Sequence, residues 1–137
     1  MNTPRTAHLA VAIVAAASLV AAASLVAVAG PAEASGGNDV VKRGNCARTT
    51  DWKLKVGPDD GRLEVEGEID SNRNGQTWTW LIRHNGSVSA RGTKTTRAPS
   101  GSFEVRRVLV NLSGVDTIVF RATNTRNGEV CRGVVRF

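Results

Sequence analysis

The sequence predicts an all-β domain that follows an N-terminal leader, and three observations support this prediction. Beyond residue 34, no stretch shows the 3.6-residue apolar period of an amphipathic helix. Short segments instead alternate apolar and polar residues, as half-buried strands do. Clusters of Gly, Pro, Asn and Asp separate these segments about every 8–12 residues, which is the spacing of a small all-β domain.

Residues 1–34 have the three parts of a secretory signal peptide. Arg5 provides a positive start, a mostly apolar run follows over residues 9–29, and a Gly-Pro break precedes the small-residue site at residues 32–34. Cleavage there would leave residues 35–137 as one secreted domain, so we expect an extracellular location. A retained transmembrane anchor is the alternative, because the run could span a bilayer of roughly 30 Å. Its alanine content and the break that follows it favour cleavage.

The chain is basic, with 18 Lys and Arg against 12 Asp and Glu and a net charge of +6. This balance favours acidic partners, although a charge of this size also promotes solubility. The basic residues are spread along the chain without a run of five or six, which argues against a specific nucleic-acid site. We expect no membrane contact once the leader is removed, and an anionic cell-wall or extracellular polymer is the candidate partner.

Cys46 and Cys131 are the only two cysteines. In an oxidising compartment an even number predicts disulfides, and two cysteines allow only one intramolecular pairing. The bridge would join the start of the domain to its last strand and stabilise it by roughly 4 kcal/mol on the chain-entropy model. Free thiols that bind metal or act as nucleophiles are the alternative. That alternative lacks a C-x-x-C spacing and has only one histidine, His84, beyond the leader.

Seven strands are predicted, and the first four run over residues 52–56, 63–70, 76–83 and 87–93. The second strand has apolar residues on one face and only acidic residues on the other, as a half-buried antiparallel strand requires. The third carries Trp78 and Trp80 on its apolar face, and Asn85-Gly86 is a strong hairpin signal after it. The fourth has few apolar residues, so we expect it at the edge of a sheet.

A long polar connection over residues 94–101 suits a crossing between two sheets. The last three strands are predicted over residues 103–111, 116–124 and 130–137. In the first of these the apolar parity changes near Arg106-Arg107, and a β-bulge would reconcile the two halves.

This pattern is typical of an immunoglobulin-like or fibronectin-III-like β-sandwich of about seven strands. A small closed barrel is the alternative. Trp78 or Trp80 would lie at the centre of the sandwich. The cysteines are not placed as in antibody domains, so the disulfide would hold the ends of the domain together rather than the middles of the sheets.

Two segments carry a resemblance to known proteins. Residues 94–103 (KTTRAPSGSF) and residues 122–133 (ATNTRNGEVCRG) resemble a group of small secreted bacterial proteins of unknown function. The resemblance covers most of the domain and implies a secreted, all-β, single-disulfide fold. It implies no catalytic residue, because no activity is established for that group.

Two patterns of polar side chains are candidates for metal binding or catalysis. Asp70, Asn72 and Asn74 have the D-x-N-x-N-G form of the first half of a calcium loop. The glutamate that an EF-hand needs at the twelfth position is Leu81 here, so an ordinary turn is the stronger interpretation. The glutamates within residues 64–68 are better explained by pairing with basic residues of a neighbouring strand than by acid–base catalysis.

The sequence contains no recognisable catalytic constellation and no cofactor motif, so we expect a non-enzymatic domain without a cofactor. The first hypothesis is that the domain binds an anionic extracellular or cell-wall partner through basic side chains of its later strands. The residues proposed for these contacts are Arg106, Arg107, Arg132 and Arg136, and the predicted strand between them, residues 116–124, carries Arg121.

Two other hypotheses concern sugars and hydrolysis. A carbohydrate-binding module would use an exposed tryptophan, whereas Trp78 and Trp80 are expected in the core. A small secreted hydrolase would need a concave site with convergent titratable groups. His84 lies beside the predicted hairpin turn and is expected to be exposed.

Overall fold

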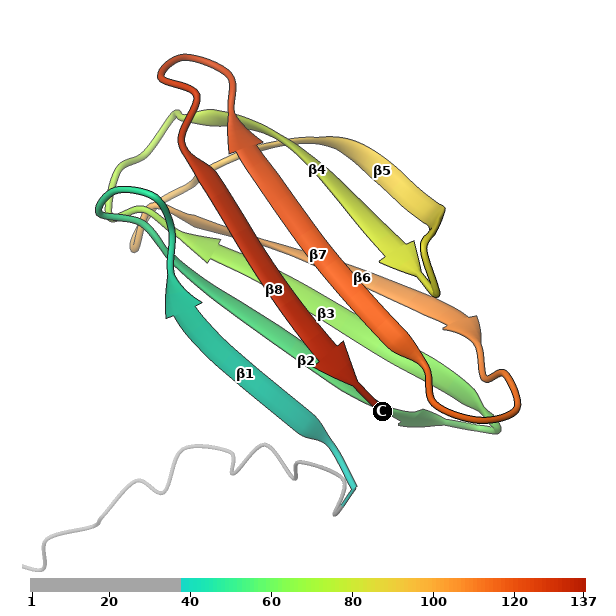
Figure 1. Ribbon diagram of the computed structural model, residues 1–137. Helices are drawn as coiled ribbons and strands as arrows, with labels where there is room; N and C mark the ends of the chain where they lie inside the picture. Colours follow the sequence, from blue (N-terminus) through green and yellow to red (C-terminus); the bar gives the residue numbers. More distant parts are fainter. Residues whose placement is uncertain (1–37) are drawn as a thin grey trace, which may run out of the picture. The chain divides into compact units, whose positions relative to one another are not determined.

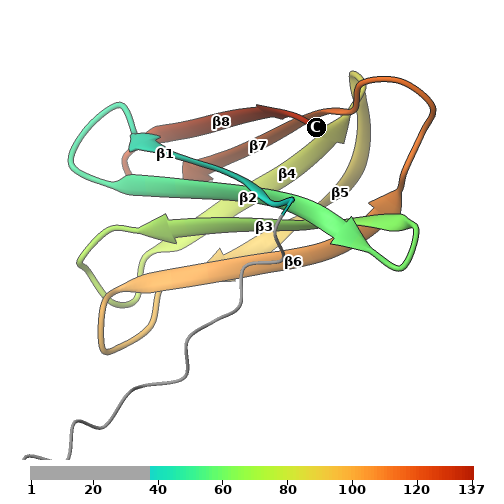
Figure 2. The same cartoon turned by 90° about the horizontal axis from the view of Figure 1, so that it is seen from below.

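The structure of the protein is a computed structural model that describes residues 38–137. These residues form a sandwich of two four-stranded antiparallel sheets (Figures 1 and 2). Figure 2 shows the two layers from the side, with β7 and β8 in one layer and β2 and β3 in the other. The predicted all-β sandwich is therefore confirmed. The barrel alternative is wrong, because the sheets are separate and each keeps two edge strands.

The predicted signal peptide lies outside the described residues, so cleavage and export stay predictions. Of the domain expected after cleavage, residues 35–137, the structure describes everything from Asn38 onward. Within this described part, no helix is long and apolar enough to cross a membrane.

Sheet A has the strand order β1-β2-β3-β6 and sheet B the order β5-β4-β7-β8. Sheet A consists of β1 (Val40–Asn45), β2 (Asp51–Asp59), β3 (Arg62–Asp70) and β6 (Ser102–Val110). Sheet B consists of β4 (Thr77–His84), β5 (Ser87–Thr95), β7 (Thr117–Asn124) and β8 (Val130–Arg136). The chain crosses between the sheets after β3, β5 and β6, and the second crossing is the predicted polar connection.

The described residues form eight strands, one more than predicted, and the additional one is β1. It pairs along its whole length with β2, from Val40 opposite Val56 to Asn45 opposite Asp51. Lys42 occupies one of the positions that point toward the other sheet, so the apolar alternation that marks a strand is missing. An edge strand tolerates such a residue, because its side chain reaches water past the rim of the sandwich.

The core lies between the sheets and is built from the alternate, inward-facing residues of the central strands. Trp78 is fully buried and Trp80 is 4% exposed, so the prediction that both are core residues is confirmed. Gly67 of β3 provides room for the Phe120 ring, since a Cβ atom there would come within 2.7 Å of it. The two sheets therefore fit closely at their middle.

Strand β6 runs against β3 in one continuous register, so the predicted bulge near Arg106-Arg107 is wrong. Phe103 and Val105 are buried, and the next inward position belongs to Arg107. The Arg107 guanidinium lies 5.0 Å from the centroid of the Trp80 ring. A cationic side chain thus covers the edge of the core by a cation–π contact, and the valines that follow face outward.

The loops gather at the two ends of the sandwich. At the upper left of Figure 1 lies the group that we call the loop end, formed by residues 46–50, 71–76, 96–101 and 125–129. The predicted disulfide between Cys46 and Cys131 is present and joins the first of these loops to β8. The opposite end holds residues 60–61, 85–86 and 111–116 and the C-terminus.

Candidate functional site

Charged residues divide unequally between the two sheets. The strands of sheet A carry seven acidic and seven basic residues. The strands of sheet B carry six basic residues and no Asp or Glu. The rest of the sequence has equal numbers of both signs, so sheet B accounts for the net charge of +6. The basic residues of sheet B are Arg83, Arg91, Lys94, Arg121, Arg132 and Arg136.

On the outer face of sheet A, the glutamates of β3 pair with basic residues of both neighbouring strands. These glutamate side chains are half-buried among their partners rather than held out in solvent. The glutamates of β3 are therefore neutralised within their own sheet, which confirms the predicted cross-strand pairing. The ion pairs of this face include Lys53–Glu68, Lys55–Glu66, Lys55–Asp39 and Arg106–Glu64.

Lys55 lies at the centre of these ion pairs. Its Nζ atom is 3.3 Å from Glu66 Oε2, 3.5 Å from Asp39 Oδ2 and 4.0 Å from Glu64 Oε1. Partial burial acts to lower the pKa of Lys55, but its hydrogen bonds and attraction to Glu66 and Asp39 outweigh burial and raise that pKa above 10.5. The cation and its carboxylates hold one another, which leaves this face little unbalanced charge for a partner.

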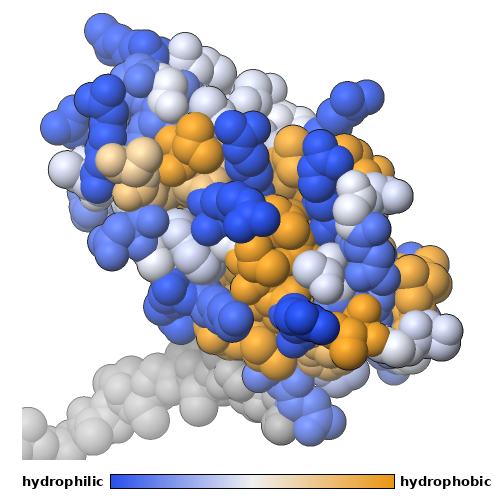
Figure 3. Space-filling view, in the orientation of Figure 1, coloured by the Kyte–Doolittle hydropathy of each residue, from blue (hydrophilic) through white to orange (hydrophobic). Residues whose placement is uncertain are grey.

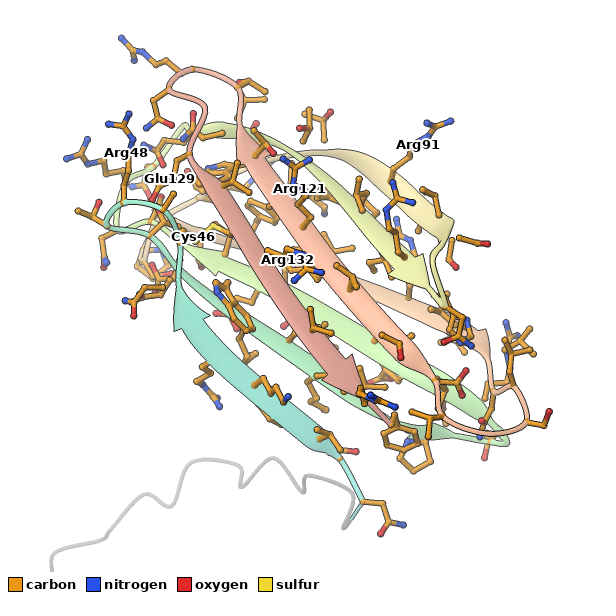
Figure 4. The ribbon with its side chains drawn as sticks, in the orientation of Figure 1. Cys46, Arg48, Arg91, Arg121, Glu129 and Arg132 are labelled. Carbon is orange, nitrogen blue, oxygen red and sulfur yellow. A yellow bond between two sulfur atoms is a disulfide. The ribbon has the colours of Figure 1, made fainter. Side chains whose placement is uncertain are left out.

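The outer face of sheet B is turned toward the viewer in Figures 3 and 4, and its strands carry arginines but no Asp or Glu. One row of cross-strand partners runs from Arg91 of β5 through Leu81 of β4 and Arg121 of β7 to Arg132 of β8. Figure 4 shows Arg121 and Arg132 side by side, with Arg91 farther along the same face. We call this set the arginine face: Arg83, Arg91, Arg121, Arg132 and Arg136.

All five side chains of the arginine face are exposed. None of them forms an ion pair with a carboxylate in residues 38–137. Between the arginines lie the half-buried side chains of Leu81, Val119 and Val134, and Figure 3 shows hydrophobic and hydrophilic residues interleaved on this face. Such a surface supports the arginine stems and leaves their charged ends in solvent.

A hollow of about 360 Å³ lies on the arginine face between Arg91 and Arg121. Its lining includes Thr79, Thr93 and Thr123, whose hydroxyl groups are hydrogen-bond donors beside the two guanidinium groups. A groove of about 570 Å³ at the edge of sheet A is lined by side chains of both signs. The hollow of sheet B is therefore the better fit for an anion.

The structure separates the four arginines that the sequence proposed for anion contacts. Arg132 and Arg136 lie on the arginine face. Arg106 lies on the outer face of sheet A, where it pairs with Glu64, and Arg107 lies over Trp80 at the edge of the core. The interpretation of the sequence overlooked Arg83 and Arg91, although both lie in or beside predicted strands whose outward positions are easily assigned.

The Asp70 segment forms a turn in the structure. Asp70 Oδ1 accepts a hydrogen bond from the backbone N–H of Asn72 at 3.2 Å, and Asn72 and Gly75 have positive φ angles. These are the features of an Asx turn closed by a glycine. No group of three or more His, Cys, Asp or Glu that could hold a metal occurs in the described part of the chain. Calcium binding by Asp70, Asn72 and Asn74 stays an untested hypothesis.

The three tryptophans offer little surface for stacking against a sugar. Trp78 and Trp80 are buried, and Trp52 is half-buried with its ring against Gly44 and Gly133. Trp52 Nε1 also donates a hydrogen bond to the carbonyl of Asn45 at 3.2 Å, which fixes the ring in place. Trp52 also lines the groove of about 570 Å³ at the edge of sheet A, so it is the tryptophan that a carbohydrate could reach, whereas Trp78 and Trp80 are enclosed in the core.

His84 is buried, so the expectation that it is exposed was wrong. Its Nε2 atom forms a hydrogen bond with Oδ1 of the buried Asp116, and Asp116 Oδ2 accepts one from the N–H of Leu112 at 3.3 Å. These contacts fasten the end of β4 to the 111–116 loop. The side chain of Asp116 could not be anticipated as a partner of His84, because the two residues are 32 positions apart in the sequence.

Comparison with known proteins identifies no family for this chain. No protein-family model, curated protein or solved structure matches it. What the structure supports is a small all-β protein of two sheets with one disulfide, and the resemblance to secreted bacterial proteins stays a prediction.

Proposed function

We propose that the protein is a secreted, non-enzymatic β-sandwich domain that binds an anionic extracellular or cell-wall polymer through the arginine face. The observation that carries this proposal is the absence of acidic residues from the strands of sheet B, whereas sheet A neutralises its own charges. An exposed guanidinium without a carboxylate partner is free to bind a phosphate, sulfate or carboxylate group in a bidentate manner.

The arrangement of the row favours a polymer over a small ion. Neighbouring strands lie about 4.8 Å apart, so the row from Arg91 to Arg132 spans roughly 14 Å. Three cationic groups along this line suit a chain that repeats an anionic group, with the threonine hydroxyls of the hollow available to its neutral parts. Binding should release counterions and therefore weaken as salt is added.

Binding to polyphosphate tests the proposal, with the protein purified from an exporting bacterial host that expresses the full chain. Replacing Arg91, Arg121 and Arg132 by glutamine should weaken binding and reduce the dependence of log K on log salt by roughly 0.7 for each phosphate group that is no longer neutralised. The matched control is the variant K42Q/R43Q/R62Q, which removes three exposed positive charges from sheet A. An equal loss in both variants, or binding that does not respond to salt, would contradict the proposal.

Export and the type of sandwich belong to the same proposal. The leader pattern and the single disulfide support secretion, and mass spectrometry should find Ser35 at the N-terminus of the exported protein. A chain that keeps residues 1–34 would contradict this. The order β5-β4-β7-β8 opposite β2-β3-β6 supports a fibronectin-III-like arrangement, with β1 as an additional edge strand.

A further inference from the structure

Each of the four loops at the loop end carries one arginine. These residues are Arg48, Arg73, Arg97 and Arg126. Arg73 lines two adjacent cavities, one of about 250 Å³ that also borders Arg48 and one of about 670 Å³ that also borders Arg126. None of these arginines forms an ion pair within the described range 38–137.

The arginine-bearing loops are held from below by buried polar side chains. Of the buried polar residues described, five lie at or beside this end: Thr50, Ser71, Thr96, Asn124 and Glu129. Glu129 Oε1 accepts a hydrogen bond from the backbone N–H of Arg48 at 3.1 Å. Asn124 Oδ1 accepts one from the backbone N–H of Arg126 at 2.9 Å. These bonds fix the backbone at both arginines.

The loop that carries Arg73 is fixed in the same manner. The carbonyl of Arg73 accepts hydrogen bonds from the hydroxyls of Ser71 and Thr96, and the N–H of Gly75 donates to the carbonyl of Thr96 at 2.8 Å. Three loops that are far apart in sequence therefore present their arginines from a rigid base. Such preorganisation lowers the entropic cost of binding a ligand.

Glu129 does not cancel the positive charge of this end by a direct ion pair. Its carboxylate is 4% exposed and accepts hydrogen bonds from the N–H groups of Arg48 and Thr50 and from the Thr50 hydroxyl. Figure 4 shows Glu129, Arg48 and Cys46 close together, and the disulfide of Cys46 holds the same loop. The guanidinium groups remain available at the surface above this buried support.

We propose that the loop end is a second anion site, separate from the arginine face, and that it takes a compact phosphate ester of a sugar or polyol. The larger cavity is bordered by Arg73 and Arg126 and has no carboxylate in its lining, so it suits a phosphate dianion. Arg48 borders the smaller cavity, which Glu129 also lines. Gln76 lines both cavities, and its buried Oε1 atom accepts no hydrogen bond within the described residues. A ligand hydroxyl beside the phosphate would supply the donor that this oxygen lacks.

Nuclear magnetic resonance of the protein, purified as above, tests this site with glycerol phosphate as the probe. The amide signals of residues 46–50, 71–76 and 125–129 should shift, and glycerol and inorganic sulfate should bind more weakly. R73Q should weaken binding at least about tenfold, as the loss of a charge-assisted hydrogen bond predicts. R97Q is the matched control, because Arg97 lies at the same end but borders neither cavity, and it should change affinity less than about twofold.

The outcome separates this site from the arginine face. The variant R91Q/R121Q/R132Q should bind glycerol phosphate like the unchanged protein, even though it loses polyphosphate. Three results would each overturn the second site. R73Q and R97Q could weaken glycerol phosphate binding equally, sulfate and glycerol phosphate could bind with equal affinity, or the amide shifts could be confined to sheet B. Loss of polyphosphate binding only in the R73Q variant would overturn the arginine face as the polymer site instead.

Discussion

The two outer faces of the sandwich have similar backbones, but among the described residues the charges are paired on the face of sheet A and unpaired on the face of sheet B. In sheet A, the glutamates of β3 lie between the lysines of β2 and Arg106 of β6. Sheet B places arginines on three of its four strands in one row, with Leu81 on the remaining strand and no carboxylate on any of its strands. The first face satisfies its charges internally, whereas the second leaves them for an external partner.

The difference shows that the number of basic residues is a poor guide to anion binding. Sheet A carries seven basic side chains and sheet B carries six, but sheet A also carries seven acidic residues. Attraction to a polyanion depends on the charge that remains after neighbouring residues have paired.

The largest effect is expected from reversing the charge of the row. The variant R91E/R121E/R132E should raise the dissociation constant for polyphosphate about a hundredfold or more, because attraction at three positions becomes repulsion. Its free energy of unfolding should change by less than about 1 kcal/mol, since these side chains are exposed and form no ion pairs with the described residues. Fluorescence anisotropy and thermal unfolding measure the two quantities. Retained binding would show that the partner uses another surface.

A smaller effect is expected when a carboxylate is placed between the arginines. Leu81 is the cross-strand partner of both Arg91 and Arg121, so L81E would place a carboxylate between two arginines of sheet B, as the glutamates of β3 lie between basic residues in sheet A. Binding of polyphosphate should weaken about tenfold. The control L81Q removes the same apolar side chain without adding charge and should retain most of the affinity. If L81E and L81Q bind alike, charge balance does not distinguish the two faces.

The converse change removes the acidic residues of sheet A. In the variant E64Q/E66Q/E68Q, Lys53, Lys55 and Arg106 lose their partners on β3. The domain should become less stable by about 1–2 kcal/mol and should bind polyphosphate a few times more tightly, through a second basic face. Chemical denaturation and binding isotherms would record both. Unchanged affinity would show that a set of unpaired cations is insufficient, and that the geometry of the row matters.

The smallest effect concerns pH. Because the folded state raises the pKa of Lys55, its ion pairs contribute stability that is complete below pH 10.5 and is lost as the pH rises through the folded pKa. Unfolding measured between about pH 9 and 12 should therefore show a steeper loss of stability for the unchanged protein than for K55Q, by less than about 1 kcal/mol. Parallel curves would indicate that these ion pairs add nothing to stability.

Much of the fold was predictable from local patterns. The alternation of apolar and acidic residues located β3, and Asn85-Gly86 located the hairpin between β4 and β5, where both residues have positive φ angles. Strand β1 was not predicted, and Arg107 was expected to contact an anion rather than to lie over Trp80. Both lie at edges of the sandwich, where a polar residue in an inward position can reach solvent and the period-two pattern weakens.

The sequence by itself determined that the chain would form short antiparallel strands, which side of strands such as β3 and β4 would be buried, and that two cysteines would pair. These properties follow from the alternation of side chains along a strand and from the number of cysteines. Only the tertiary structure decided which strands share a sheet, and with that choice it placed Arg91, Arg121 and Arg132 in one row while Arg106 joined the acidic face. The physical reason is that strand pairing is a non-local interaction. It brings residues that are tens of positions apart to within about 5 Å, so a net charge dispersed along the chain becomes concentrated on one sheet.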